Sequence, residues 1–262
     1  MLRKGMLIHL LNRSVLSVRG VDAAAFLQAT TTNDINLLKA NEALYSLLLN
    51  SRGRIVHDMI IYKQDANGCF FIECDASHCG KLQNIFNMYK MHKSVIIEKS
   101  ILKVFYSDSI HTGSVKDPRV ASFGNRVLSE NVPDGTLSDM MNYQEKRFDY
   151  GIVEGVAETS GEIPFTNKGC YIGQELTNRS MTVLEIRKRV FPFTCSDMVS
   201  GTVLNERSET VGRIIACNGR KGLALVNLKK GSTNSFQTSK GSIALCVPHW
   251  WPYNLSRKCM IK

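Results

Sequence analysis

The sequence lacks any hydrophobic run long enough to cross a bilayer. Such a span takes about 20 apolar residues, whereas the longest apolar segments, Leu44 to Leu49 and Ile55 to Tyr62, have the length of strands. Residues 1 to 11 are basic and then apolar, but no small-residue cleavage site follows them, and no Arg- and Ser-rich transit peptide is evident. We therefore expect neither membrane insertion nor secretion.

The sequence also lacks the spacings that are typical of paired metal-binding or redox cysteines. None of the eight cysteines forms a C-x-x-C pair, and the six histidines show no H-x-x-x-H spacing. Cys69, Cys74 and Cys79 are evenly spaced, but the first two fall on one expected strand, five residues apart, and should point to opposite faces. These patterns favour free thiols in a reducing compartment over a disulfide framework or a zinc site.

Acidic residues are scarce in the last part of the chain. Residues 185–262 carry 13 Lys and Arg but only 4 Asp and Glu, whereas residues 1–184 carry 20 and 19. A basic surface of this kind can meet nucleic acid or an acidic partner. No nucleic-acid-binding motif accompanies the charge, so we expect no sequence-specific nucleic-acid binding. The shift in charge and pattern near 181–187 predicts two domains, 1–183 and 184–262.

The first domain mixes strand and helix patterns, which favours an α+β fold. A helix is expected from residue 23, with Asp22 as its cap, and residues 124–135 have the composition of a loop. Further strands and helices are expected at 8–18 (two short strands), 43–50, 55–62, 69–74, 77–91 (helix), 95–98, 102–106 and 138–150 (helix).

After residue 189 the pattern changes to short strands separated by turns. They are expected at 190–194, 201–204, 210–217, 223–227 and 242–247. Several short strands at close, regular spacing are typical of a small antiparallel β-barrel. We expect the tryptophan pair at 250–251 to pack the end of the chain onto that barrel.

The densest candidate site is the segment from Lys168 to Glu175. Gly169 and Gly173 bracket Cys170 and permit unusual backbone dihedrals and close approach. Lys168, and the start of any helix that follows, would both lower the pKa of the Cys170 thiol and favour the thiolate that binds metals and attacks electrophiles. The alternative is that Cys170 is a small buried residue in a tight turn.

The segment Lys168-Gly169-Cys170-Tyr171-Ile172-Gly173-Gln174-Glu175 closely resembles the signature of the YgfZ-type family. That family includes mitochondrial iron–sulfur cluster assembly factors and is similar in fold to the glycine-cleavage T-protein, an aminomethyltransferase. Further family landmarks follow in the expected order: residues 18–28, 32–34, 50–55, 117–119, 147–152, 186–189, 211–213, 222–225 and 248–252. The resemblance therefore covers nearly the whole chain.

The resemblance implies a T-protein-like folate-binding core, followed by the barrel, and a late role in maturing [4Fe–4S] proteins. It implies location in the mitochondrial matrix and an A-type iron–sulfur scaffold protein as partner. Cys170 would ligate a [2Fe–2S] cluster shared with that partner, and tetrahydrofolate would be a small-molecule ligand. The motif residues Lys168, Gly169, Tyr171, Gly173, Gln174 and Glu175 would surround the ligating cysteine.

The resemblance also places Asp58 and Arg147 at the folate pocket, where a carboxylate can pair with the nitrogens of reduced folate. His57 stands where the T-protein pattern has another acid, and only three residues separate Pro164 from Lys168, fewer than in the family. The histidine argues against aminomethyl transfer, and the short link predicts weak folate binding. An assembly factor is thus the preferred function. The alternatives are a tetrahydrofolate-dependent one-carbon transferase, which would rely on Asp58, and a nucleic-acid-associated factor, which would rely on the basic domain.

Overall fold

The computed structural model describes residues 5–64, 68–162, 188–227 and 235–251. The chain forms two compact units. One comprises Met1–Met140 and Glu154–Leu184, and the other comprises Met141–Val153 and Glu185–Lys262. The expected domains, 1–183 and 184–262, differ from these units in residues 141–153, which lie in the second unit with the C-terminal strands.

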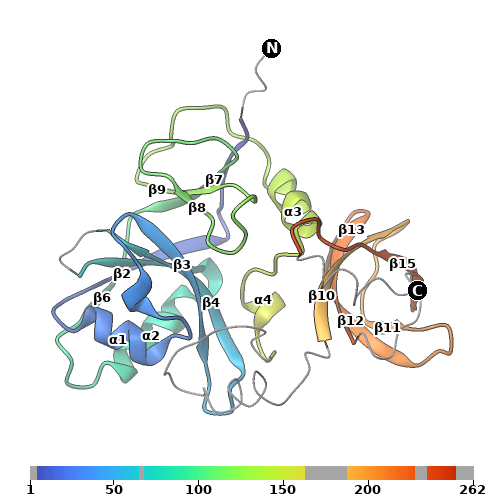
Figure 1. Ribbon diagram of the computed structural model, residues 1–262, viewed down its shortest axis with the longest axis horizontal. Helices are drawn as coiled ribbons and strands as arrows, with labels where there is room; N and C mark the ends of the chain where they lie inside the picture. Colours follow the sequence, from blue (N-terminus) through green and yellow to red (C-terminus); the bar gives the residue numbers. More distant parts are fainter. Residues whose placement is uncertain (1–4, 65–67, 163–187, 228–234, 252–262) are drawn as a thin grey trace. The chain divides into compact units, whose positions relative to one another are not determined.

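The first unit is built on a five-stranded antiparallel sheet with the order β3-β4-β5-β2-β6 (Figure 1). Its strands are β2 (Arg13–Arg19), β3 (Glu42–Leu49), β4 (Ile55–Lys63), β5 (Phe70–Asp75) and β6 (Ile96–Lys99). Helices α1 (Ala23–Thr30) and α2 (Cys79–Tyr89) pack on one face, where Phe26 and Phe86 meet edge to face at 5.4 Å. Alternate positions of β2, β4 and β5 supply the rest of this apolar core.

A second sheet with the order β1-β7-β9-β8 completes the unit. Its strands are β1 (Leu7–His9), β7 (Lys103–Ser107), β8 (Val115–Lys116) and β9 (Asn125–Ser129). The remaining elements are two short 3-10 turns, η1 (Ile35–Leu37) and η2 (Ala76–His78), and the one-turn helix α4 (Val156–Thr159). Arg126 of β9 reaches Glu73 of β5, so charged side chains fill part of the space between the two sheets.

Two expectations about this unit are wrong. Residues 125–129 are not a loop but strand β9, which pairs with β7 over its whole length. Asp22 makes no side-chain cap to α1; its Oδ2 instead accepts a hydrogen bond of 2.7 Å from the backbone N–H of Ser94. In both cases a partner distant in sequence decides the local structure.

The second unit contains a closed antiparallel barrel with the order β10-β13-β12-β11-β14-β15, as the strand pattern predicts. Its core is apolar, and Trp251 packs on Phe191 with ring centroids 5.3 Å apart, which confirms the expected packing for Trp251. Trp250 is 37% exposed, and its Nε1 donates to Tyr150 O at 2.9 Å. The strands are β10 (Lys188–Cys195), β11 (Thr202–Leu204), β12 (Thr210–Asn218), β13 (Lys221–Asn227), β14 (Ser235–Thr238) and β15 (Gly241–Leu245).

Helix α3 (Met140–Asp149) belongs to this unit from residue 141 onward. Asn218 at the end of β12 donates to Gln144 Oε1 at 2.8 Å, and Lys221 forms an ion pair of 2.9 Å with Asp149. Both contacts come from the β12–β13 hairpin. Across the described residues, no helix combines the length and apolar character that crossing a membrane requires.

Candidate functional site

The segment from Lys168 to Glu175, with Cys170, lies outside the described residues. The structure does describe the chain that leads to it. The N–H of Gly161 donates to Ile55 O, and the N–H of Ile55 donates to Glu162 O, each at 2.9 Å. The approach to the cysteine segment is therefore hydrogen-bonded to the first residue of β4.

The loop before β4 is fixed by its own polar groups. Asn50 Oδ1 accepts from the N–H groups of Arg52 and Arg54 at 2.9 and 3.0 Å, an arrangement typical of Asx turns. Gly53 has φ +67°, a conformation that favours glycine. Arg54 then reaches Gly161 O at 3.3 Å. Hydrogen bonds thus hold the loop at residues 50–54 against residues 161–162, which precede the cysteine segment.

A layer of buried charge lies between the two sheets of the first unit. Arg126, which is fully buried, pairs with Asp117 at 3.0 Å, Glu154 at 2.8 Å and Glu73 at 3.5 Å. Arg119 adds contacts of 2.7 Å to both Asp117 and Glu154. The layer contains three guanidinium groups and four carboxylates. The guanidinium groups are those of Arg13, Arg119 and Arg126, and the carboxylates are those of Asp58, Glu73, Asp117 and Glu154.

Opposing effects set the ionisation of this layer. Burial alone would raise the pKa of Asp117, because it penalises the charged form. The guanidinium groups of Arg119 and Arg126 outweigh that penalty, and the pKa of Asp117 lies below its ordinary value. The carboxylate is therefore held ionised by its partners, and loss of either guanidinium would leave a buried charge poorly compensated.

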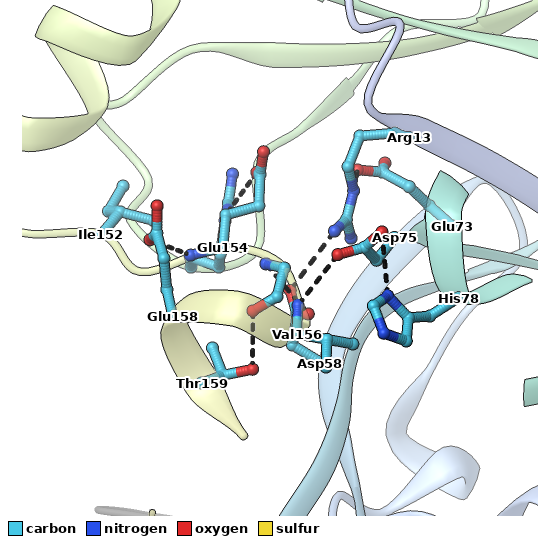
Figure 2. Close-up of polar contacts among 12 residues, drawn as sticks. Arg13, Asp58, Glu73, Asp75, His78, Ile152, Glu154, Val156, Glu158 and Thr159 are labelled. Carbon is cyan, nitrogen blue, oxygen red and sulfur yellow. Dashed lines mark hydrogen bonds and ion pairs between the residues drawn. The ribbon is translucent and has the colours of Figure 1, made fainter. Parts of the chain in front are cut away.

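Asp58 lies at the edge of this layer, and its side chain is fully buried. Figure 2 shows it between Arg13 and the start of α4. Its Oδ1 accepts a hydrogen bond of 3.1 Å from the N–H of Gly155, and its Oδ2 lies 3.5 Å from Arg13 Nη1. Arg13 is held in turn by Glu73 at 2.9 Å. Both oxygens of Asp58 are thus engaged by the protein.

Arg147 and Asp58 lie in different compact units. Arg147 is buried in the second unit, where its Nη1 donates to Ile152 O at 2.8 Å and its guanidinium stacks over the Phe148 ring at 4.9 Å. These contacts stabilise the end of α3. They give Arg147 a structural role within its own unit.

His57 is a buried polar side chain beside the Asp58 site. It is 1% exposed, and neither ring nitrogen has a hydrogen-bond partner among the described residues. Its ring lies 6.2 Å from that of His78, which is itself 3.5 Å from Asp75. Burial, and then the nearby His78 and Lys81, lower the pKa of His57 to about 4, although Asp75 acts in the opposite sense.

His57 makes the free energy of unfolding depend on pH between about pH 6.5 and about pH 4. Below the ordinary pKa of about 6.5 the unfolded chain takes up a proton at His57, while the folded chain stays neutral there until about pH 4. The free energy of unfolding should therefore fall as pH drops through this window. His57→Phe removes the titration, so its urea-unfolding free energy should fall less than that of the wild type over the same range. Parallel pH curves for the two proteins would contradict the assignment.

Cys74 and Cys79 meet beneath α2, a contact that the spacing of the three cysteines does not reveal. Both thiols are buried, and the hydrogen bond between them lowers the pKa of Cys79, the first residue of α2, to about 6. Within the described residues no cluster of three or more metal-binding side chains occurs. Both residues belong to the apolar core of the first unit, so this pair is a core contact.

Sequence reasoning missed Arg126, Glu154 and Glu73 as members of the site. A signal was present for Glu73, since it interrupts a strand of Phe, Ile and Cys residues that is otherwise suited to the core. Isolated charges in such strands indicate buried ion pairs. Arg126 and Glu154 gave a weaker signal, because each lies close to a glycine, Gly124 and Gly155, in a segment that does not read as a continuous core strand.

The two units, an α+β unit and a closed antiparallel barrel, define a protein with a T-protein-like fold. Residues 6–100 match the GCVT N-terminal domain, and residues 187–253 match the CAF17 C-terminal β-barrel domain. A crystal structure of the glycine cleavage system aminomethyltransferase T from Bartonella henselae is similar with a TM-score of 0.72, over 93% of this chain and 85% of that one. At 12% sequence identity this likeness concerns the fold alone.

Curated relatives identify the family. The human iron–sulfur cluster assembly factor IBA57, mitochondrial, is 33% identical, over 92% of this chain and 83% of its own length. The mouse protein of the same name is 31% identical, with 92% and 84% covered. The chain belongs to the IBA57 family. The human alignment spans 298 residues, more than the 262 of this chain, so the relative contains segments that this chain lacks.

Proposed function

We propose that this protein is a mitochondrial iron–sulfur cluster assembly factor that acts late in [4Fe–4S] maturation. The observation that supports it is family membership together with the intact segment from Lys168 to Glu175. Cys170 serves as a ligand of a [2Fe–2S] cluster shared with an A-type scaffold partner in the mitochondrial matrix. The cluster is cargo, and the soft thiolate is the ligand type that iron–sulfur clusters take.

The described residues support a scaffolding role more than a catalytic one. Asp58, the carboxylate that one-carbon transfer would need, is buried and engaged by Gly155 and Arg13. Among the described residues, neither ring nitrogen of His57 has a hydrogen-bond partner. Gly161 and Glu162, which precede the cysteine segment in the chain, are instead tied by backbone hydrogen bonds to Ile55 of β4. Anaerobic cluster reconstitution with the scaffold, with and without Cys170, tests this function.

Reduced folate should bind weakly. Isothermal calorimetry with tetrahydrofolate is expected to give a dissociation constant above about 0.1 mM, since binding would have to displace the contacts of Asp58. Asp58→Asn keeps the shape of the side chain and removes its charge. Micromolar affinity that depends on Asp58 would restore the transferase as the preferred function, and micromolar affinity that survives Asp58→Asn would remove Asp58 from any folate site.

A further inference from the structure

Two thiols meet inside the barrel of the second unit. Cys195 ends β10, Cys217 lies near the end of β12, and both pack against the barrel core. Their Sγ atoms are 3.9 Å apart, and each donates to Gly219 O at 3.8 Å. Both residues are partly exposed, so small solutes can reach them, unlike the buried pair Cys74 and Cys79.

Three strands of the barrel carry this meeting. Strand β13 separates β10 from β12, and Gly222 of β13 lies opposite both Phe193 and Cys217. A Cβ at Gly222 would come within 2.3 Å of Ala216 O and 2.4 Å of the Phe193 ring, so only glycine fits there. The three strands are therefore closely packed beside the two thiols, which face one another from β10 and β12.

We propose that Cys195 and Cys217 form an oxidisable dithiol, a modification site that closes to a reversible disulfide by exchange with low-molecular-weight disulfides such as glutathione disulfide. The Cys217 thiolate attacks one sulfur of glutathione disulfide, the disulfide bond breaks, and one glutathione leaves and takes up a proton. Cys195 then loses its proton, attacks the Cys217 sulfur of the mixed disulfide, and releases the second glutathione. The two protein thiols lose two electrons and two protons, and glutathione disulfide is reduced to two glutathione molecules.

The order of attack and the reversibility both have physical grounds. Burial and the neighbouring Cys217 raise the pKa of Cys195 to about 11, so Cys195 is held as the thiol and acts second. Closing the bond shortens the sulfur separation from 3.9 Å to about 2.05 Å and draws β10 and β12 together. Both residues are partly exposed, and exposed disulfides are more easily reduced than buried structural ones.

Oxidation would act on the hairpin that holds α3. The disulfide removes both thiol donors from Gly219 O, in the turn between β12 and β13. Asn218 and Lys221, which flank that turn, make the contacts to Gln144 and Asp149. We therefore expect the oxidised protein to show faster amide exchange at the end of α3.

The test uses the full chain equilibrated in glutathione buffers from reducing to oxidising, quenched with acid, alkylated and mapped by peptide mass spectrometry. Alkylation of Cys195 and Cys217 should fall in parallel, by roughly five-fold or more in the oxidising buffer, and the two peptides should appear joined. Reduction with dithiothreitol should restore both. Cys217→Ser should abolish the joined peptide and leave Cys195 alkylated, whereas Cys195→Ser should leave glutathione attached to Cys217.

Cys246→Ser is the matched control, because Cys246 is an exposed thiol of the same unit and should not affect the joined peptide. The proposal is overturned if Cys195 and Cys217 stay alkylated in a buffer that attaches glutathione to Cys246. It is also overturned if each of the two thiols carries its own glutathione without joining. Because serine differs from cysteine by one atom, circular dichroism should show all three variants folded.

Discussion

Cys170→Ser is expected to lower the cluster absorbance of the complex reconstituted with an A-type scaffold by roughly ten-fold or more. Serine keeps the size of the side chain but replaces a soft, readily ionised ligand with a hydroxyl that stays protonated near neutral pH. Clusters normally take four ligands, so one cysteine cannot hold a cluster alone. The remaining ligands should come from the partner, and the visible absorbance should therefore require both proteins.

A matched control separates ligation from general thiol effects. Cys246→Ser removes an exposed thiol of the barrel and should leave the loading of the complex unchanged. Both variants should unfold at the same temperature as the wild type. Equal and equally stable loading in the wild type and in Cys170→Ser would reject the ligand assignment, and Cys170 would then be a turn residue or a nucleophile.

The strands of both units were largely predictable from local pattern, because alternation and turn residues are encoded within short windows. Strand β9 was not, since Gly124, Asn125 and Arg126 resemble a loop until β7 supplies the partner backbone. The prediction that Asp22 caps α1 was wrong for a similar reason, because the Asp22 carboxylate accepts a hydrogen bond from Ser94, which lies 72 residues away. Local signals thus gave the elements, while non-local contacts decided these exceptions.

The candidate site was less accessible to sequence reasoning than the fold. The motif around Cys170 is a local signature and can be recognised by itself. Asp58 was found through its place beside a family landmark, but its burial depends on Gly155, which is 97 residues away. The meeting of Cys195 and Cys217 joins β10 and β12, which β13 separates in the barrel, and spacing along the chain does not reveal it.

Arg126→Met should destabilise the first unit by about 3–5 kcal/mol, the cost typical of removing one partner from a buried ion pair. Methionine fills part of the space but leaves Asp117, Glu154 and Glu73 buried around an apolar side chain. The full Coulombic attraction in the layer is not the relevant quantity, because the charges also lost their hydration on folding. What the variant measures is the penalty of leaving these buried carboxylates with only Arg119 and Arg13 to compensate them.

Arg19→Met provides the comparison, because Arg19 pairs with Glu98 at 2.7 Å while their side chains are 52% and 56% exposed. Exposed pairs of this kind contribute about 0–1 kcal/mol, so this variant should stay close to the wild type.

The two units allow the effect of Arg126→Met to be localised. Both tryptophans of the chain, at 250 and 251, belong to the second unit, so tryptophan fluorescence reports on the barrel. Amide exchange in β4 and β9 reports on the first unit. Exchange there should accelerate strongly in Arg126→Met, while the fluorescence transition in urea should move little. A loss in the first unit no larger than that of Arg19→Met would mean that the buried charges reorganise or take up protons, and that the layer does not require Arg126.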